Sequence, residues 1–400
     1  MKKVWGCKTP FFFDSAIRTH KIKMKQQKTN NWQIKKLGEV CKIIMGQSPP
    51  SDTYNENAKG MPFFQGKAEF TDLYPVVKKY CSKPTKIAEP LDILLSVRAP
   101  VGTTNIANIQ CCIGRGLAAI RFDNYKYGFY FLRSIQHELD SKGTGTTFRA
   151  ISGETIRETL IPYPNQETQH AIVSKIEELF SELDKGIAEL KTAQLQLKTY
   201  RQSVLKSAFE GKLTNDNVKE GELPEGWKLK NLGEIFKVSS GKGIKINQLK
   251  GGDYCVYGGN GLNGYHSEYF IEESVLIIGR VGVKCGVTHI TKPKGWVSDN
   301  ALIVKPIIED FDIKFFKLRL EFENLNKLSV STAQPVISGN SIYSVQVFLP
   351  KLEEQYRIVQ EIESRLSVAD KMEQSIQESL QKAEALRQSI LKKAFCGELV

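Results

Sequence analysis

The chain has 400 residues, of which 41% are hydrophobic and 25% charged, and its formal net charge is +12. This length predicts two to four domains, and the apolar content is that of an ordinary globular protein. No apolar run reaches the roughly 18 residues that a membrane-spanning helix needs, and the N-terminus lacks the apolar core of a signal peptide. We therefore expect a cytoplasmic protein with no membrane partner.

Residues 1–30 are a basic extension with eight Lys or Arg and a single Asp. Met24 lies shortly before a Trp-x-x-x-x-Leu-Gly-Glu element that recurs later in the chain, and the second copy of that element has no such basic segment before it. Two interpretations stay open. Either these residues form a basic arm, or Met24 is the true initiator and residues 1–23 are not translated.

Residues 31–164 are predicted to form a mixed, strand-rich domain. The apolar run Ile93–Val97 predicts a short strand, and it is followed by Arg98 and a glycine-bearing turn. The aromatic stretch Phe129–Leu132 predicts an amphipathic helix, and many Gly, Asn and Pro residues divide the rest into short pieces.

Residues 165–213 are predicted to form one long helix, followed by a linker over residues 214–223. Apolar residues recur in steps of three and four from Ile172 onward, which is the spacing of one helix face. Pro164 precedes the helix, and Gly211 stands where a C-cap is expected.

The remaining chain repeats this order. Residues 224–350 are predicted to form a second strand-rich domain, with a short strand over Val275–Ile278 before Gly279-Arg280. Residues 351–400 are predicted to form a second long helix, which Pro350 precedes and Gly397 follows. A helix of about 45 residues would be roughly 65 Å long.

Direct sequence similarity shows that this order is an internal repeat. The 34 residues from Ile151 match those from Ile337, and the same offset aligns Arg201 with Arg387 near the helix ends. The segment Trp-Gln-Ile-Lys-Lys-Leu-Gly-Glu-Val from Trp32 matches Trp-Lys-Leu-Lys-Asn-Leu-Gly-Glu-Ile from Trp227. Between these elements the two halves differ in length and share few residues. A constant frame with two variable inserts predicts two different recognition modules on a fixed spacer.

Two amphipathic helices of this length need a partner that buries their apolar faces. We predict that they pair with each other as an antiparallel coiled coil, giving an α+β fold with a pseudo-two-fold internal repeat. The predicted helix-pairing residues are Ile172, Ile176, Leu179, Leu183, Leu190, Leu197, Ile358, Ile362, Met372, Ile376, Leu386 and Ile390.

The charge is distributed unevenly between these segments. Residues 1–30 carry a net +7, and the variable segments 31–164 and 224–350 carry +5 and +3. The helical segments 165–223 and 351–400 carry −2 and −1. This distribution suits modules that face phosphates and spacers that face protein.

No catalytic or metal-binding pattern survives inspection. The glycine-rich segment Tyr257–Gly264 lacks the flanking strand and helix of a dinucleotide site, and the histidines pair with no Ser or Cys motif. The eight cysteines include no Cys-x-x-Cys pair, so reduced thiols are expected and a zinc site is not. We expect no catalytic residue, no metal and no cofactor in this chain.

The order of these motifs resembles a type I restriction-modification specificity subunit. The resemblance covers residues 31–400 and rests on Trp-Lys-x-Leu-Gly-Glu, a variable domain, Ile-Ser-Gly, Pro followed by Glu-x-Gln, and a long helix ending Arg-Gln-Ser-x-Leu-x-x-Ala-Phe-x-Gly-x-Leu, present twice. It implies that each variable segment is a target recognition domain that reads one half of a bipartite site in double-stranded DNA.

The resemblance also implies partners. The helices would space the half-sites and dock two methyltransferase subunits, which bind S-adenosylmethionine and methylate adenine at N6. Restriction subunits would join them and cleave DNA with ATP and Mg²⁺. This chain would be non-catalytic by itself.

Exposed loop residues of the two domains are the predicted DNA contacts. In the first domain they are Gln47, Ser48, Lys67, Arg98, Thr103, Arg115, Thr146 and Arg149. In the second they are Ser240, Lys242, Lys245, Asn260, Arg280, Lys284, Asn300 and Gln334. Arg98 and Arg280 are predicted to occupy matching places, each after an apolar strand.

Two other classes stay open at this point. One is a stand-alone DNA-processing enzyme, such as a nuclease with a helical dimerisation arm. The other is a scaffold that does not bind DNA. Neither the bases recognised nor the gap between half-sites follows from the sequence.

Overall fold

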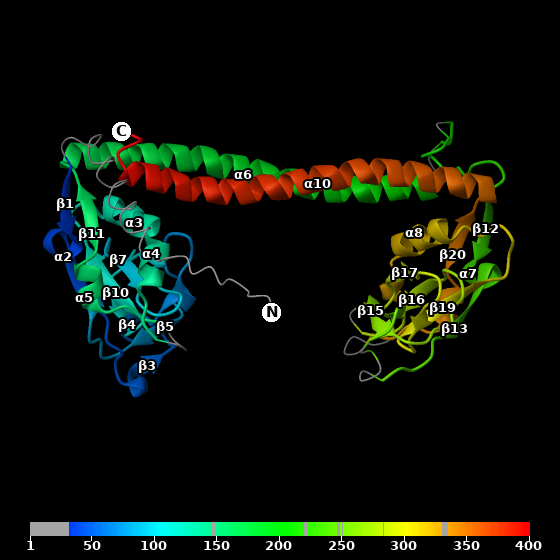
Figure 1. Ribbon diagram of the computed structural model, residues 1–400, viewed down its shortest axis with the longest axis horizontal. Helices are drawn as coiled ribbons and strands as arrows, with labels where there is room; N and C mark the ends of the chain where they lie inside the picture. Colours follow the sequence, from blue (N-terminus) through cyan, green and yellow to red (C-terminus); the bar gives the residue numbers. More distant parts are fainter. Residues whose placement is uncertain are drawn as a thin grey trace, which may run out of the picture. The chain divides into compact units, whose positions relative to one another are not determined.

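The computed structural model describes residues 32–400 apart from 146–148, 216, 220–221, 246–248, 250, 283 and 330–334. The chain divides into two compact units, Met1–Glu189 with Ser379–Val400 and Leu190–Glu378. Each unit contains one strand-rich module and part of each long helix (Figure 1). No helix of the described residues is long and apolar enough to cross a membrane.

The first module contains three sheets, with strand orders β1-β11, β2-β10-β7-β8 and β3-β5-β4-β9-β6. Short helices lie between and after the strands. The elements are β1 (Gln33–Lys36), α2 (Leu37–Val40), β2 (Lys42–Met45), η1 (Ser51–Thr53), β3 (Tyr54–Asn55), β4 (Met61–Phe64), η2 (Lys67–Glu69), β5 (Lys79–Cys81), β6 (Ile87–Ala88), β7 (Ile93–Ser96), β8 (Thr104–Ile106), β9 (Cys111–Ile113), β10 (Leu117–Arg121), α3 (Tyr125–Ser134), α4 (Gln136–Ser141), α5 (Gly153–Arg157) and β11 (Leu160–Tyr163).

The second module has sheets of order β12-β20, β13-β19-β16-β17 and β15-β14-β18. Its elements are β12 (Lys228–Asn231), α7 (Leu232–Ile235), β13 (Phe236–Ser240), β14 (Tyr254–Gly258), β15 (Gly261–His266), β16 (Leu276–Gly279), β17 (Thr288–Ile290), β18 (Trp296–Val297), β19 (Ala301–Pro306), α8 (Ile313–Glu323), η4 (Leu325–Leu328), α9 (Gly339–Tyr343) and β20 (Gln346–Leu349).

The two modules share a four-stranded sheet although their sequences are dissimilar. The four-stranded sheets β2-β10-β7-β8 and β13-β19-β16-β17 have the same order, and every pairing within them is antiparallel. The central strands β7 and β16 are buried at every residue. The other large sheet differs, with five strands in the first module and three in the second. The variable segments therefore keep one common sheet and vary mainly in the other.

The long helices are α6 (Gln166–Phe209) and α10 (Leu352–Phe395), which lie within the predicted segments 165–213 and 351–400. Gly211 and Gly397 follow them with φ of +77° and +70°, the left-handed conformation that glycine adopts at a helix C-terminus. Pro164 and Pro350 precede their first turns. The described cysteines form no disulfide, and burial raises the pKa of the Cys41 and Cys111 thiols to about 12, which leaves both thiols protonated at neutral pH.

The predicted antiparallel pairing of α6 and α10 is confirmed within each unit. In the first unit the start of α6 packs with the end of α10, through buried residues such as Ile172, Ile176, Ile390 and Leu391. In the second unit the end of α6 packs with the start of α10, where Val204, Ala208, Ile358 and Ile362 share one cluster.

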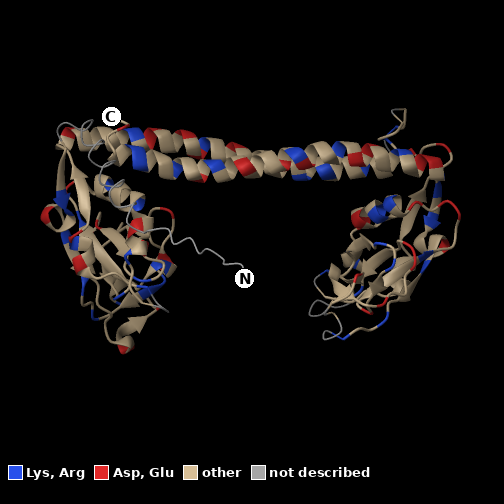
Figure 2. Cartoon of the chain, in the orientation of Figure 1, with Lys and Arg blue, Asp and Glu red and all other residues tan. Residues whose placement is uncertain are grey.

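In each unit an arginine joins the two helices by ion pairing. Arg387 binds Asp184 in the first unit, and Arg201 binds Asp370 at 2.7 Å in the second. The repeat relates both members of one Arg–Asp pair to those of the other, because Arg201 aligns with Arg387 and Asp184 with Asp370. These four residues therefore fix the same pairing register in both units. Figure 2 shows acidic and basic residues interspersed along both helices.

The prediction for the helix seam needs correction at two positions. Met372 and Leu386 are 53% and 50% exposed, whereas Ala369, Ile376 and Ala383 lie buried seven residues apart. Met372 precedes Glu373, and Leu386 precedes Arg387. Both charged residues make ion pairs with the other helix, so the positions that face that helix lie one residue after the predicted ones. Of the other predicted residues, Leu179, Leu183 and Leu190 are half-buried, and the rest are buried.

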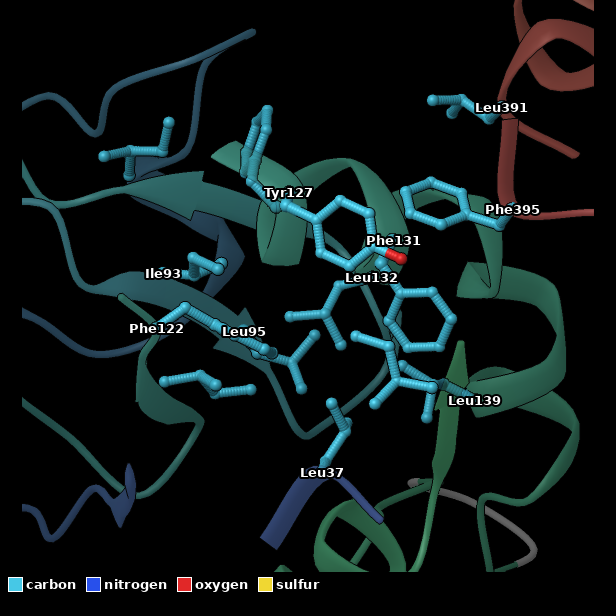
Figure 3. Packing of buried hydrophobic residues seen from close by; sticks show 14 of the residues in the cluster. Leu37, Ile93, Leu95, Phe122, Tyr127, Phe131, Leu132, Leu139, Leu391 and Phe395 are labelled. Atoms are coloured by element: carbon cyan, nitrogen blue, oxygen red, sulfur yellow. The ribbon is translucent and has the colours of Figure 1, made fainter. Parts of the chain in front are cut away.

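Each module is attached to the helices through its aromatic core. In the first unit Phe395 of α10 lies 5.2 Å from the ring of Tyr127 and 5.3 Å from that of Phe131, both on α3. Figure 3 shows Phe395 and Leu391 facing these rings above Leu132 and the strand residues. Edge contacts of this kind add about 0.5–1.5 kcal/mol each to the gain from burial. The predicted helix at Phe129–Leu132 is confirmed as part of α3, and Phe315 and Phe316 lie on α8.

Candidate nucleic-acid interface

In the first module two loops converge on the turn that precedes β10. Gly46 N donates to Leu117 O at 2.9 Å, and Arg115 N donates to Ser48 Oγ at 3.2 Å. A Cβ at Gly46 would lie 2.2 Å from Gly114 O, so only glycine fits there. The loop after β2 is thus held against the turn, which brings Gln47 and Ser48 beside Arg115.

The second pair of predicted contacts joins the same surface. Val97 N donates to Gly116 O, and Ala99 N donates to Arg149 O, both at 2.9 Å. The side chains of Arg98, Arg115 and Arg149 are exposed, and Arg149 lies 3.5 Å from Asp140. The structure therefore gathers Gln47, Ser48, Arg98, Arg115 and Arg149 at the end of the shared sheet.

Three predicted contacts of the first module are not in this group. Lys67 and Thr103 line a cavity of about 540 Å³ within the first unit, together with Arg133, Asp184 and Arg387. Burial lowers the pKa of Arg133. These two residues face the long helices, and their role as DNA contacts stays a prediction. Thr146 lies outside the described residues.

The second module gathers its predicted contacts in the same way. Gly241 N donates to Ala301 O at 3.1 Å, and Arg280 N donates to Asn300 O at 2.9 Å. A Cβ at Gly241 would lie 2.2 Å from Ser298 O, so glycine is again required. Arg280 Nη1 also donates to Ser240 Oγ at 3.4 Å. Ser240, Arg280 and Asn300 thus meet at one surface.

The other predicted contacts of this module lie on adjacent loops. Lys242 N donates to Val297 O at 2.8 Å, and Asn260 follows Gly259, whose Cβ position is 2.9 Å from Asn300 O. Lys284 lies in the loop that joins β16 to β17, and Lys245 lies in the loop after β13. Both lysines are exposed. Gln334 lies outside the described residues.

The hydrogen bonds correct the predicted match between Arg98 and Arg280. Ile151 N donates to Val97 O and Ile337 N donates to Arg280 O, and the repeat aligns Ile151 with Ile337. Arg280 therefore corresponds to Val97. Arg98 corresponds to Val281, because the isolated bridges Arg98–Ala150 and Val281–Val336 are equivalent. The two arginines follow equivalent strands but occupy neighbouring positions.

Sequence reasoning missed two polar groups beside this surface in the second module. His289 Nε2 and Ser298 Oγ are buried atoms that have no hydrogen-bond partner among the described residues. The His289 ring lies 3.2 Å from a Cβ placed on Gly261, next to Asn260. Burial, followed by the charge of Lys317, lowers the pKa of His289, so the ring is neutral at pH 7. Neither residue belongs to a motif that its sequence position could reveal.

No group of three His, Cys, Asp or Glu side chains within the described parts of the chain is arranged to hold a metal ion. The predicted contact residues on this surface carry guanidinium, ammonium, amide and hydroxyl groups on turns and loops. Such groups bind phosphates and the edges of bases.

Comparison with known proteins identifies the family. Residues 29–192 and 224–382 match the family model for the type I restriction modification DNA specificity domain. The chain belongs to this family, and its two matched regions correspond to the two halves of the repeat. The family favours a specificity subunit over the alternative of a stand-alone nuclease.

Individual relatives agree. The chain is 39% identical over 189 residues to the type I restriction enzyme MjaX specificity subunit assigned in Methanocaldococcus jannaschii, a match that spans 46% of this chain and 44% of that relative. It is 26% identical to the type I restriction enzyme StySPI specificity subunit of Salmonella potsdam, over 84% of this chain and 80% of the relative. A chain in a solved structure of type I restriction-modification complex assembly shares the fold, with a TM-score of 0.75 at 20% identity, covering 92% of this chain and 98% of that one.

Proposed function

We propose that this chain gives a type I restriction-modification complex its DNA sequence specificity, and that each module reads one part of a bipartite, asymmetric site. One observation carries the proposal: two modules with dissimilar sequences present exposed polar residues on the same turn of the same sheet. Phosphate contacts would set the register of each module, and the differing side chains would read different bases.

The domain limits follow from this role. Residues 31–164 and 224–350 would be the target recognition domains, residues 165–213 and 351–400 the spacer helices, and residues 214–223 a linker. The basic segment 1–30 falls outside the described residues.

The long helices would dock two methyltransferase subunits, and restriction subunits would join the assembly. Large apolar side chains on the outer faces of the helices support this part of the proposal, since they are 43–69% exposed here and a partner helix would cover them. They are Leu195, Tyr200, Tyr356, Val368, Met372 and Leu386. The partner subunits would bind S-adenosylmethionine and carry out adenine N6 methylation and the ATP- and Mg²⁺-dependent cleavage. This chain would supply the DNA sequence specificity.

The proposal is tested by exchanging one module. Replacing residues 41–150 with the matching segment of a relative keeps β1, β11 and both long helices of this chain. We expect one half of the methylated site to change and the other half to persist, as read by sequencing of methylated adenines in cells that carry the complex. The reciprocal exchange of residues 236–336 is the control and should change the other half only. A change in both halves after either exchange would contradict separate reading.

The arginines of the first module provide a finer test. Replacing Arg115 with Ala should weaken binding of specific DNA by about 1–3 kcal/mol and relax one base if its guanidinium reads guanine. If it contacts a phosphate, affinity should fall for all sequences and the salt dependence should lose about one unit of log–log slope. Arg149→Ala should have a smaller effect, because Asp140 already faces that side chain.

Salt titrations of DNA binding by the assembled complex distinguish these outcomes. Arg157→Ala is the matched control, since Arg157 lies on α5 and pairs with Glu154. If Arg98→Ala, Arg115→Ala and Arg149→Ala all keep the affinity, slope and methylation pattern of the original chain, this surface does not face DNA.

A further inference from the structure

Equivalent turns at the candidate interface carry side chains of opposite charge. The turn before β10 is closed by Leu117 N donating to Gly114 O at 3.0 Å, and the turn before β19 by Ala301 N donating to Ser298 O at 3.1 Å. Both turns hold the preceding loop through the same backbone bond, from Gly46 in one module and Gly241 in the other. The second residue of each turn is therefore equivalent: it is Arg115 in the first module and Asp299 in the second.

Asp299 has no structural role that explains a carboxylate at this position. Its side chain is exposed, and it forms neither an ion pair nor a hydrogen bond with the described residues. Asp and Asn commonly stabilise turns and helix starts by accepting backbone N–H groups, as Asp312 does for Phe315. Asp299 makes no such bond, so the backbone of the turn does not depend on it.

A carboxylate here is also unfavourable for contact with the DNA backbone. Phosphates repel a carboxylate, whereas they attract the neighbouring side chains of Lys242, Arg280 and Lys284. A carboxylate does have one favourable partner in the major groove, the exocyclic amino group of a base. Asp and Glu accept hydrogen bonds from cytosine N4, and adenine N6 offers the same kind of donor, whereas arginine pairs with guanine O6 and N7.

We propose that Asp299 is a base-reading residue of the second module and accepts a hydrogen bond from an exocyclic amino group in the major groove. Arg115 is its counterpart in the first module, where the guanidinium can only donate. This inference rests on the proposed reading of DNA by the two modules. It explains in chemical terms how two modules with one fold select different half-sites: an acceptor replaces a donor at the same point of the same turn.

The test compares Asp299→Ala and Asp299→Leu, neither of which offers an acceptor, in the full chain, assembled with its methyltransferase subunits. Methylated sites are sequenced, and binding is measured in competition with DNA in which each base pair of the second half-site is changed. We expect both variants to lose preference at one base pair of the second half-site by about 10- to 100-fold. The identity of that pair distinguishes cytosine from adenine. The first half-site should not change.

Binding to nonspecific DNA gives a second readout. Removal of a negative charge should leave that affinity unchanged or make it tighter, in contrast to the loss expected for a residue that contacts a phosphate. Glu309→Ala is the matched control, because Glu309 is an exposed acid of the same module beyond the other end of β19. It should retain every base preference.

Asp299→Leu keeps a branched side chain but has no acceptor, so it decides the question if the alanine variant does not fold. The inference is overturned if the leucine variant keeps every base preference of the original complex. It is also overturned if the specificity change appears in the first half-site. If the unmodified complex shows no bipartite preference at all, the proposed function itself fails, which is a separate result.

Discussion

Shortening both long helices by one heptad is expected to abolish methylation of the original bipartite site. Removing residues 190–196 from α6 and 375–381 from α10 deletes segments that lie, along the sequence, between the residues of the two cross-helix Arg–Asp ion pairs. Asp184, Arg201, Asp370 and Arg387 are therefore kept. Because a heptad repeat is preserved, the apolar seam continues through each junction.

The expected loss follows from the geometry of DNA. Seven helical residues correspond to about 10 Å, or roughly 3 base pairs. Three base pairs also turn the double helix by about a third of a turn, whereas a heptad returns to nearly the same helix face. A site with a gap shorter by 3 base pairs would thus present one half-site in the wrong direction. Each base pair that the module no longer reads costs about 1–3 kcal/mol of binding free energy. Losing the contacts to one half-site should therefore lower methylation more than ~100-fold.

A control separates the effect of the spacer's length from the effect of its sequence. Replacing the same two heptads with other heptads that keep the apolar positions should preserve methylation at the original gap. Sequencing of methylated adenines reads both variants. Continued methylation of the original site by the shortened chain, at the rate of the unmodified one, would show that the helices do not set the distance between half-sites.

The sequence predicted those parts of the fold that repeat or that follow a local period. The long helices, their proline and glycine boundaries and the strands β7 and β16 have local signatures, and the structure confirms them. The sequence did not show that the two modules share a four-stranded sheet. A buried strand requires only side chains that can be buried, and Ile93–Ser96 and Leu276–Gly279 meet this requirement with different residues.

Errors arose where one residue of register matters. Arg98 and Arg280 look alike in the sequence because each follows an apolar strand, yet their backbone bonds place them one position apart. Met372 and Leu386 have the right chemistry for a helix seam and lie beside it, since ion-paired Glu373 and Arg387 occupy the neighbouring positions. Asp299 gave no local signal. Its equivalence to Arg115 is shown only by backbone hydrogen bonds between residues far apart in the sequence.

The second large effect is expected from a buried glutamine at the start of α10. Gln355 is fully buried, and its side chain makes three hydrogen bonds. Its amide donates to Asp310 O at 2.9 Å and to Pro350 O at 3.0 Å, and its Oε1 accepts from Asp312 N at 2.9 Å. Asp312 is the N-cap of α8, so Gln355 connects the first turn of the long helix to the start of the module's own helix.

Gln355→Ala is expected to destabilise the second unit by about 2–4 kcal/mol, because it leaves a cavity and removes the partners of three backbone groups. Gln169 occupies the equivalent position in the repeat and supplies the control. It is buried as well, but among the described residues its amide donates only to Pro164 O, at 3.0 Å. Gln169→Ala should therefore cost only about 1–2 kcal/mol, in the first unit. Thermal unfolding of the full chain measures both losses, and limited proteolysis locates the weakened unit. Equal destabilisation by the two substitutions would show that the bonds to Asp310 and Asp312 contribute little, and that the shared bond to the proline carbonyl is what the repeated glutamine provides.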